Sequence, residues 1–492
     1  MNKQIRRLAL ALMGIYVILF AQLNWLQVAK AKAYSGDAGN TRGVIKDFSR
    51  ARGTIFTADN QIAAESVPSN DQYAYRRNYP MGDLLGHPVG YFSLKYGTTE
   101  VESAYNDVLT GKTAQQQLKG IGNMFSGKTE TGDVYLSLRA DLQQAAKDAL
   151  GQREGSVVLV DPRTGAVKAM WSNPSYDPNQ IADHNFKNAE DARALYLLNA
   201  SKPLLANAYQ ERYMPGSTFK VLTSTAGFEN GALTLDKSFD VTKEWLPPNT
   251  QIPIKNYGGE LCGGTMRRVF EISCNIPFAQ TSLALGADKM VAAVNNFGFN
   301  EKAPLDLPDV AASYFGQVKD FDRNDPKLAQ SGFGQNAVQG TPLEMALVAS
   351  AVANKGKIMA PYVVDETRDS AGGVLAKAQP KVWKTAMSEA TAATLNGFMI
   401  GVVNSGTARC CMKLNNGIQA AAKTGTAQLR GPTDPGGQSS HAWIIGFAPA
   451  ENPVVAFAVF VKASPEVTAG VGGTIAGPIA KSVLDVALTV LQ

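Results

Sequence analysis

The longest run of hydrophobic positions lies close to the N-terminus, from Leu8 to Val28. Basic residues flank it on both sides: Lys3, Arg6, Arg7, Lys30 and Lys32. About twenty apolar residues span a bilayer as a helix, and basic residues ahead of the run keep that end in the cytoplasm. The pattern predicts a transmembrane signal-anchor within residues 1–33. A signal peptide cleaved near Ala31–Lys32–Ala33 is the alternative, and both place the remaining chain outside the cytoplasmic membrane.

Residues 34–132 carry no candidate chemistry of their own. A tether containing Gly, Asp and Asn at residues 35–40 is followed by short β-rich runs that Gly and Pro interrupt. The region is too short for a glycosyltransferase domain, and it carries no paired carboxylates in a convincing context. We interpret it as a small β-rich pedestal domain.

From residue 133 onward, patterns typical of strands and of helices alternate. The helices are expected at 139–150, 216–229, 276–285, 341–350 and 475–491. The strands are expected at 156–161, 166–171, 420–427, 442–447 and 454–461, with a loop at 429–440. This alternation predicts a mixed α/β fold for residues 133–492.

The composition and charge of the chain argue against a nucleic-acid-binding protein and against a metal site. The chain has 492 residues, 45% of them hydrophobic and 18% charged, which is typical of a globular protein. Its net charge of +5 includes no basic run, only pairs such as Arg6–Arg7 and Arg267–Arg268, so nucleic acid is not an expected partner. Three scattered histidines and four cysteines lack metal-ligand spacing, so we expect no metal and no cofactor.

The candidate chemistry begins at Pro215–Gly216–Ser217–Thr218–Phe219–Lys220. Residues three apart on a helix share one face, so the Ser217 hydroxyl and the Lys220 amine are expected to be neighbours. A buried amine that is neutral can take the proton of a serine nucleophile. A Ser-x-x-Lys pair alone is most often solvated helix surface, so the pattern needs support from elsewhere in the chain.

That support comes from Ser273–Cys274–Asn275 and Lys423–Thr424–Gly425, which follow in this order. Ser273 and Asn275 could alternatively be ordinary helix caps. Taken together, the three motifs resemble the signature set of penicillin-binding proteins and serine β-lactamases. The chain is similar to class B penicillin-binding proteins of the shorter PbpA-like type. Arg52–Gly53–Thr54–Ile55 partly resembles the stretch that opens their non-catalytic region.

The resemblance implies roles for these residues. Ser217 would be the nucleophile, Lys220 its base and Ser273 a proton relay, while Asn275 would hold Lys220 and a substrate carbonyl. A substrate carboxylate would be bound by Lys423, Thr424 and Thr426 on a strand whose small Gly425 admits a peptide backbone. The backbone N–H groups of Ser217 and Thr426 would form the oxyanion hole.

The implied fold is the penicillin-binding transpeptidase fold, with a central antiparallel sheet flanked by helices. The implied activity is a membrane-anchored peptidoglycan D,D-transpeptidase that β-lactams acylate. A D,D-carboxypeptidase and a non-catalytic β-lactam sensor or scaffold are alternatives, and a β-lactamase is disfavoured by the anchor, pedestal and length. The implied partners are stem peptides ending in D-Ala-D-Ala, β-lactams and a membrane-embedded glycosyltransferase of the SEDS type.

The four cysteines lie on the side of the membrane where disulfides form. We predict a Cys262–Cys274 bond, because the glycine-rich loop between them has little apolar content to hold it beside Ser273. Two free buried thiols are the alternative. For Cys410 and Cys411, which are adjacent in the chain, no pairing is predicted.

Overall fold

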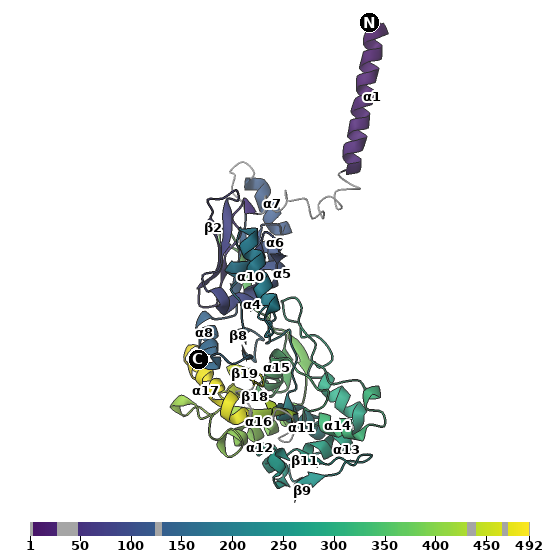
Figure 1. Ribbon diagram of the computed structural model, residues 1–492, viewed down its shortest axis with the longest axis vertical. Helices are drawn as coiled ribbons and strands as arrows, with labels where there is room; N and C mark the ends of the chain where they lie inside the picture. Colours follow the sequence, from purple (N-terminus) through teal and green to yellow (C-terminus); the bar gives the residue numbers. More distant parts are fainter. Residues whose placement is uncertain (1–2, 27–47, 124–129, 431–438, 465–470, 492) are drawn as a thin grey trace. The chain divides into compact units, whose positions relative to one another are not determined.

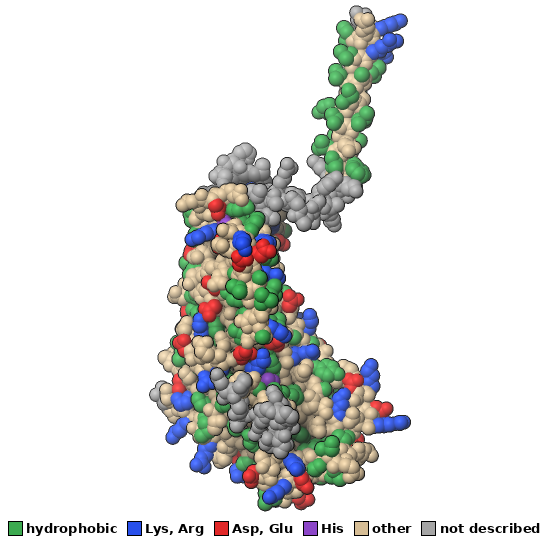
Figure 2. Space-filling view, viewed as in Figure 1, with side chains coloured by type: hydrophobic (Ala, Val, Ile, Leu, Met, Phe, Trp, Pro, Cys, Tyr) green, Lys and Arg blue, Asp and Glu red, His purple; other side chains and the backbone are tan. Residues whose placement is uncertain are grey.

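The computed structural model describes residues 3–26, 48–123, 130–430, 439–464 and 471–491. The chain divides into two compact units: residues 1–51 with 66–76, and residues 52–65 with 77–492. In the first unit, helix α1 (Lys3–Trp25) has no buried residue, and Figure 2 shows hydrophobic side chains along its whole length and basic ones near its N-terminal end. The predicted cleavage position and the tether lie outside the described residues.

A five-stranded antiparallel sheet is the centre of the second unit. Its strands follow the order β17-β18-β19-β7-β8, so β17 is an edge strand. Every residue of β7 and β19 is buried, which requires cover on both faces of the sheet. The strands are β7 (Gly155–Val160), β8 (Val167–Asn173), β17 (Ala421–Arg430), β18 (Ser439–Ala448) and β19 (Val455–Val461).

Helices cover the sheet. α8 (Ala140–Leu150) packs on β8, and α17 (Gly472–Val490) packs on α8, β18 and β19, as the yellow and blue helices beside each other in Figure 1 show. α15 (Pro342–Ala353) packs on β7, β18 and β19, and eleven of its residues are buried. Among the described residues, α1 and α17 are long and apolar enough to cross a membrane, but α17 is half-buried as a core helix.

A second group of helices lies next to the edge strand. The central one is α11 (Lys220–Glu229), in which every residue from Lys220 to Gly227 is buried and which packs on α13 and α16. Its position explains why Phe219, Leu222 and Ala226 are apolar, since they supply the core contacts of this group. The neighbours are α12 (Met266–Glu271), α13 (Ile276–Asn295), α14 (Asp325–Ser331) and α16 (Glu389–Asn404).

A six-stranded sheet, ordered β15-β14-β6-β1-β2-β3, combines two distant parts of the chain. β6 (Gly132–Leu136) pairs with β1 (Ile55–Phe56) on one side and with β14 (Val364–Asp369) on the other. β14 and β15 therefore extend a sheet whose other strands precede residue 137. The remaining strands of this sheet are β2 (Ile62–Pro68), β3 (Tyr75–Asn78) and β15 (Val374–Lys377).

A buried ion-pair cluster fixes the start of this region. Glu102 accepts from Arg52 Nε at 2.6 Å and from Arg77 Nε at 2.6 Å, and all three side chains are almost fully buried. Two cations on one carboxylate compensate for its loss of solvent, and they keep the pKa of Glu102 below its usual value although burial raises it. The other helices here are α4 (Gly86–Val89), α5 (Glu100–Ala104), α6 (Asn106–Leu109), α7 (Ala114–Asn123), α9 (Pro178–Ile181) and α10 (Phe186–Leu198).

Small two-stranded sheets complete the second unit: β4 (Phe92–Ser93) with β5 (Gly97–Thr98), β9 (Ser238–Thr242) with β12 (Cys262–Thr265), β10 (Glu244–Trp245) with β11 (Ile254–Lys255), and β13 (Lys357–Met359) with β16 (Val382–Thr385). The mixed α/β fold is confirmed. The loop expected at 429–440 is too long, because Gln428 pairs with Ser440 and Arg430 pairs with Ser439. The pairing of β17 with β18 continues through these four residues although all four are polar.

Candidate active site

Ser217 lies in the 3-10 turn η3 (Gly216–Phe219), which leads directly into α11. Gly216 has a φ of +54°, and a Cβ on it would come within 2.6 Å of the Thr426 carbonyl oxygen. Its N–H donates to the Gly334 carbonyl at 3.0 Å. Glycine is required here, because it lets the turn lie directly against β17 while Ser217 stays at the surface of the pocket.

Lys220 is fully buried at the first position of α11. Its Nζ donates to the Ser273 carbonyl oxygen at 2.8 Å, to Asn275 Oδ1 at 2.8 Å and to Ser273 Oγ at 3.2 Å. The three acceptors form a cradle around the Lys220 amine. The structure thus brings the second motif into contact with the lysine of the first.

The second motif is not a helix cap. Asn275 directly precedes α13, but its side chain makes no capping hydrogen bond. The cap comes from elsewhere: Asn256 Oδ1 accepts from the N–H groups of Asn275, at 2.9 Å, and Ile276, at 3.3 Å. The Asn275 side chain is thereby left for Lys220. Ser273 has a φ of +64°, a strained conformation for a residue with a side chain, and it turns its hydroxyl and its carbonyl toward the two lysines.

Lys423 of β17 is the second fully buried lysine. Its Nζ donates to Ser273 Oγ at 2.8 Å and to the Thr424 carbonyl oxygen at 3.0 Å. The Ser273 hydroxyl therefore stands between two amines that come from different motifs. A proton can pass along such a chain of hydrogen-bonded groups without any change of backbone position.

Burial sets the charge of both lysines. It lowers the pKa of Lys220 well below the usual value, and the charge of Lys423 lowers it further. Burial alone lowers the pKa of Lys423, to about 7. With both pKa values lowered by burial, a neutral amine becomes accessible at this pair near neutral pH.

The edge strand β17 carries the third motif along the pocket. Thr424 and Thr426 both line the pocket, and Thr426 Oγ1 accepts from the Gly472 N–H at 3.3 Å. A Cβ on Gly425 would lie 2.7 Å from the Pro215 carbonyl oxygen and 2.8 Å from Thr218 Cγ2. Gly425 thus admits the close approach of the nucleophile turn, whose Pro215 and Thr218 take the space that its missing side chain leaves.

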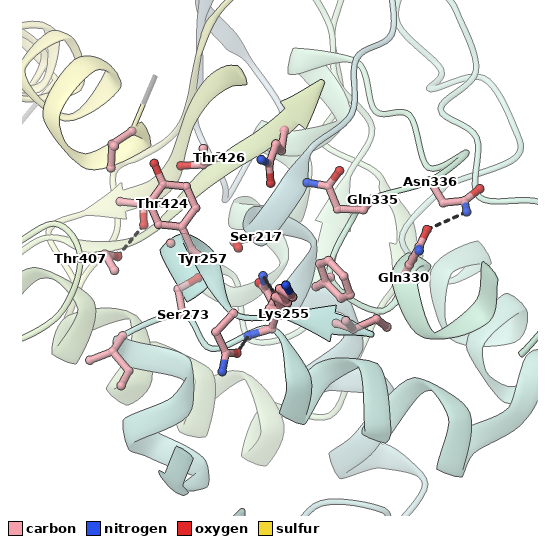
Figure 3. Close-up of a pocket in the computed structure, with 18 of the residues that line it drawn as sticks. Ser217, Lys255, Tyr257, Ser273, Gln330, Gln335, Asn336, Thr407, Thr424 and Thr426 are labelled. Atoms are coloured by element: carbon pink, nitrogen blue, oxygen red, sulfur yellow. Dashed lines mark hydrogen bonds between the residues drawn. The ribbon is translucent and has the colours of Figure 1, made fainter. Parts of the chain in front are cut away.

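The three motifs open into one pocket of about 810 Å³. Figure 3 shows Ser217 at its centre, Ser273 below it, and Thr424 and Thr426 on the strand beside it. Gln330, Gln335 and Asn336 lie on the opposite side. The pocket is also lined by Ile252, Pro253, Ile254, Lys255, Asn256, Tyr257, Gly258, Ile272, Asn275, Phe333, Thr407, Gln428, Leu429 and Val471.

Comparison with known proteins agrees with this geometry. Residues 155–485 match the family model of the penicillin binding protein transpeptidase domain, and residues 52–134 match that of the penicillin binding protein A dimerisation domain. The chain belongs to the penicillin-binding protein transpeptidase family. The resemblance predicted from the three motifs is thereby confirmed.

Individual relatives match this chain over almost all of its length. Peptidoglycan D,D-transpeptidase PbpA of Mycolicibacterium smegmatis is 35% identical over 498 residues, covering 99% of each chain. PbpA of Mycobacterium tuberculosis is 34% identical over 502 residues, with the same coverage. The ceftriaxone acyl-enzyme of penicillin-binding protein A from M. tuberculosis superposes with a TM-score of 0.83 at 32% identity, covering 90% of this chain and 100% of that one.

Cys262 and Cys274 are joined in a disulfide, with Cα atoms 5.6 Å apart. Cys274 is the middle residue of the second motif and is 1% exposed, whereas Cys262 begins β12. The bond ties β12, the strand before α12, to the backbone between Ser273 and Asn275. The adjacent Cys410 and Cys411 are also joined, with Cα atoms 3.8 Å apart.

Sequence reasoning missed several pocket residues. Asn256 supports the second motif, as described, and Thr407 is hydrogen-bonded to Thr424. Both are common polar residues outside any motif, so no local pattern distinguishes them. Their positions follow from long-range packing, which a single sequence does not display.

Proposed function

We propose that Ser217 is the nucleophile of a D,D-transpeptidase that cross-links peptidoglycan stem peptides. Membership of the family and the PbpA relatives support a serine-type acyltransferase of peptidoglycan synthesis that β-lactams acylate. The observation that carries the assignment to these residues is the convergence of Lys220 and Lys423 on Ser273, beside Ser217 in one pocket.

In the acylation step, Ser217 Oγ attacks the carbonyl carbon of the penultimate D-Ala. Neutral Lys220 takes the hydroxyl proton, and the backbone N–H groups of Ser217 and Thr426 stabilise the oxyanion. Collapse of the tetrahedral intermediate breaks the peptide bond. The departing D-Ala nitrogen receives a proton through the Ser273 hydroxyl, which Lys220 and Lys423 hold from both sides.

In the second step, an amine of a neighbouring stem peptide attacks the ester carbonyl on Ser217. Lys220 accepts a proton from that amine and returns one to the serine oxygen, so the enzyme regains its starting state. Asn275 contributes by holding Lys220 and by donating its amide to the substrate carbonyl, once the substrate replaces the Lys255 carbonyl as its acceptor.

The terminal carboxylate of the donor peptide lies against β17. Protonated Lys423 supplies charge and the hydroxyls of Thr424 and Thr426 supply hydrogen bonds. As an edge strand, β17 also offers backbone groups to an extended peptide. The same groups fit the carboxylate of a penicillin.

The proposal extends to the whole chain. Residues 1–33 form a single-pass anchor, 34–132 a pedestal and 133–492 the transpeptidase domain on the extracytoplasmic side. The exposed apolar surface of α1 supports the anchor. A membrane-embedded glycosyltransferase of the SEDS type is the proposed partner, which would supply the glycan strands to be cross-linked.

Mass spectrometry of the intact protein tests the nucleophile. Wild type should gain the mass of one penicillin, and Ser217→Ala should gain none. Ser224→Ala, on the helix α11 that follows the nucleophile turn, is the matched control: its hydroxyl is buried and, among the described residues, has no partner, so the variant should acylate normally. An adduct on Ser217→Ala would refute the assignment. Incubation with donor and acceptor peptides should yield a cross-linked dimer; release of D-Ala without any dimer would indicate a carboxypeptidase.

A further inference from the structure

Thr407 belongs to none of the three motifs, yet it faces the third. It follows α16 in the chain and lines the active-site pocket. Its Oγ1 is hydrogen-bonded to Thr424 Oγ1, the contact drawn as a dashed line in Figure 3. The Thr424 hydroxyl, which belongs to the proposed carboxylate site, is thus hydrogen-bonded to the Thr407 hydroxyl.

The backbone of Thr407 is fixed on both sides. Its N–H donates to the Glu271 carbonyl oxygen at 3.2 Å. On the other side, a Cβ on Gly473 would come within 2.4 Å of the Thr407 carbonyl oxygen, so the first turn of α17 lies directly against it. Thr407 therefore cannot shift without moving either α12 or α17.

Glu271 connects this loop to the second motif. Only Ile272 separates it from Ser273 in the chain. Its carboxylate accepts from Ser405 Oγ at 3.2 Å and from Arg267 Nε at 3.1 Å. A Cβ on Gly401 would lie 2.0 Å from Glu271 Oε1, so α16 approaches the carboxylate without an intervening side chain. The loop that carries Thr407 is consequently held by α12, the helix that ends just before the second motif.

The direction of the hydroxyl–hydroxyl bond decides what Thr424 can do. Thr424 has one hydroxyl proton. If Thr424 donates that proton to Thr407, it presents only a lone pair to an anion. If Thr407 donates, the Thr424 proton is free to point into the pocket, and the bond from Thr407 polarises it and makes it a stronger donor.

We propose that Thr407 is a positioning residue for substrate recognition: its hydroxyl donates to Thr424 Oγ1 and thereby aims the Thr424 proton at the terminal carboxylate of the donor peptide or β-lactam. This inference rests on the proposed role of β17 as the carboxylate site. Thr407 acts through Thr424 and takes no part in bond making.

The test compares Thr407→Val, which keeps the shape and removes the hydroxyl, with Thr407→Ser, which restores it. Two penicillin probes are used: penicillin G and its methyl ester, which lacks the anionic carboxylate. For Thr407→Val, acylation by penicillin G should fall about tenfold, while acylation by the ester should stay within about twofold of wild type. Thr407→Ser should recover most of the loss. Thr394→Val, on the exposed side of α16, is the matched control and should match wild type with both probes.

A second arm uses Thr424→Val. Because Thr407 acts through Thr424, the double variant should be no slower with penicillin G than Thr424→Val alone. Equal losses of Thr407→Val with both probes, or additive losses in the double variant, would overturn the inference and indicate a structural role only. Failure of the carboxylate site itself looks different: wild type would then acylate equally well with the acid and the ester.

Discussion

Replacing Lys423 by Met should make the protein more stable and inactive. The two side chains have similar length, and the Lys423 side chain is fully buried. Lowering its pKa from 10.5 to about 7 corresponds to about 5 kcal/mol of unfavourable ammonium burial below pH 7, since one pKa unit is about 1.36 kcal/mol. Met removes this cost. It also removes the hydrogen bonds to Ser273 Oγ and the Thr424 carbonyl, which offsets about 1–3 kcal/mol.

The sign of the pH dependence identifies the cause. The folded state has the lower pKa, so the unfolded chain binds more protons between about pH 7 and 10.5. The contribution of Lys423 to the free energy of unfolding of the wild type therefore becomes more favourable as the pH rises through that window. The variant lacks this ionisable group, so its stability does not show this rise. The advantage of Met should be about 3 kcal/mol smaller at pH 9 than at pH 6. In a protein of this size, about 1 kcal/mol shifts the melting temperature by about 1 °C.

The measurement is thermal unfolding of wild type and Lys423→Met at several pH values, with acylation by fluorescent penicillin alongside. Acylation should fall at least about 10²-fold, because the charge that binds the carboxylate is lost. A variant that is less stable than wild type at pH 6 would refute the reasoning. So would a stability gain that does not change with pH.

Three further changes test other parts of the site. Gly216→Ala should slow acylation about 10²-fold by separating the nucleophile turn from β17. Gly231→Ala has a similar φ but no atom within 4 Å, so it should bear only the strain of the positive φ and keep its acylation rate. Replacing Cys262 and Cys274 together by Ser should cost about 3 kcal/mol in chemical denaturation and slow acylation, and unchanged stability would contradict a structural bond. Lys220→Ala should bind penicillin reversibly in equilibrium dialysis without forming an adduct, and a normal acylation rate would remove Lys220 as the base.

Local patterns predicted much of the fold. The helical period at 139–150 corresponds to α8, and the Thr341–Pro342 step begins α15, where Thr341 accepts from the Glu344 N–H as an N-cap. The β7–β8 pair follows from two apolar runs and a Pro–Gly turn. These features depend on residues that are close together in the chain, so their pattern is visible in a single sequence.

Long-range features could not be predicted. β14 looks like any short strand, and nothing in its residues indicates that it pairs with β6 rather than with the catalytic sheet. The site shows the same division. The motifs indicated which groups react, but the cradle around Lys220 requires the folded positions of Ser273 and Asn275, and Thr407 has no signal at all until β17 lies beside it.

The composite sheet has a consequence for the order in which the protein can be assembled during synthesis. β1 and β6 are made early, but the strand that covers the other side of β6 is made only after most of the catalytic domain. Until then, β6 is an open edge with unpaired backbone groups, a template for association with other chains. The composite sheet therefore cannot be completed until β14 has been made. A fragment that stops before residue 364 should be prone to aggregate, whereas one that includes β14 closes that edge.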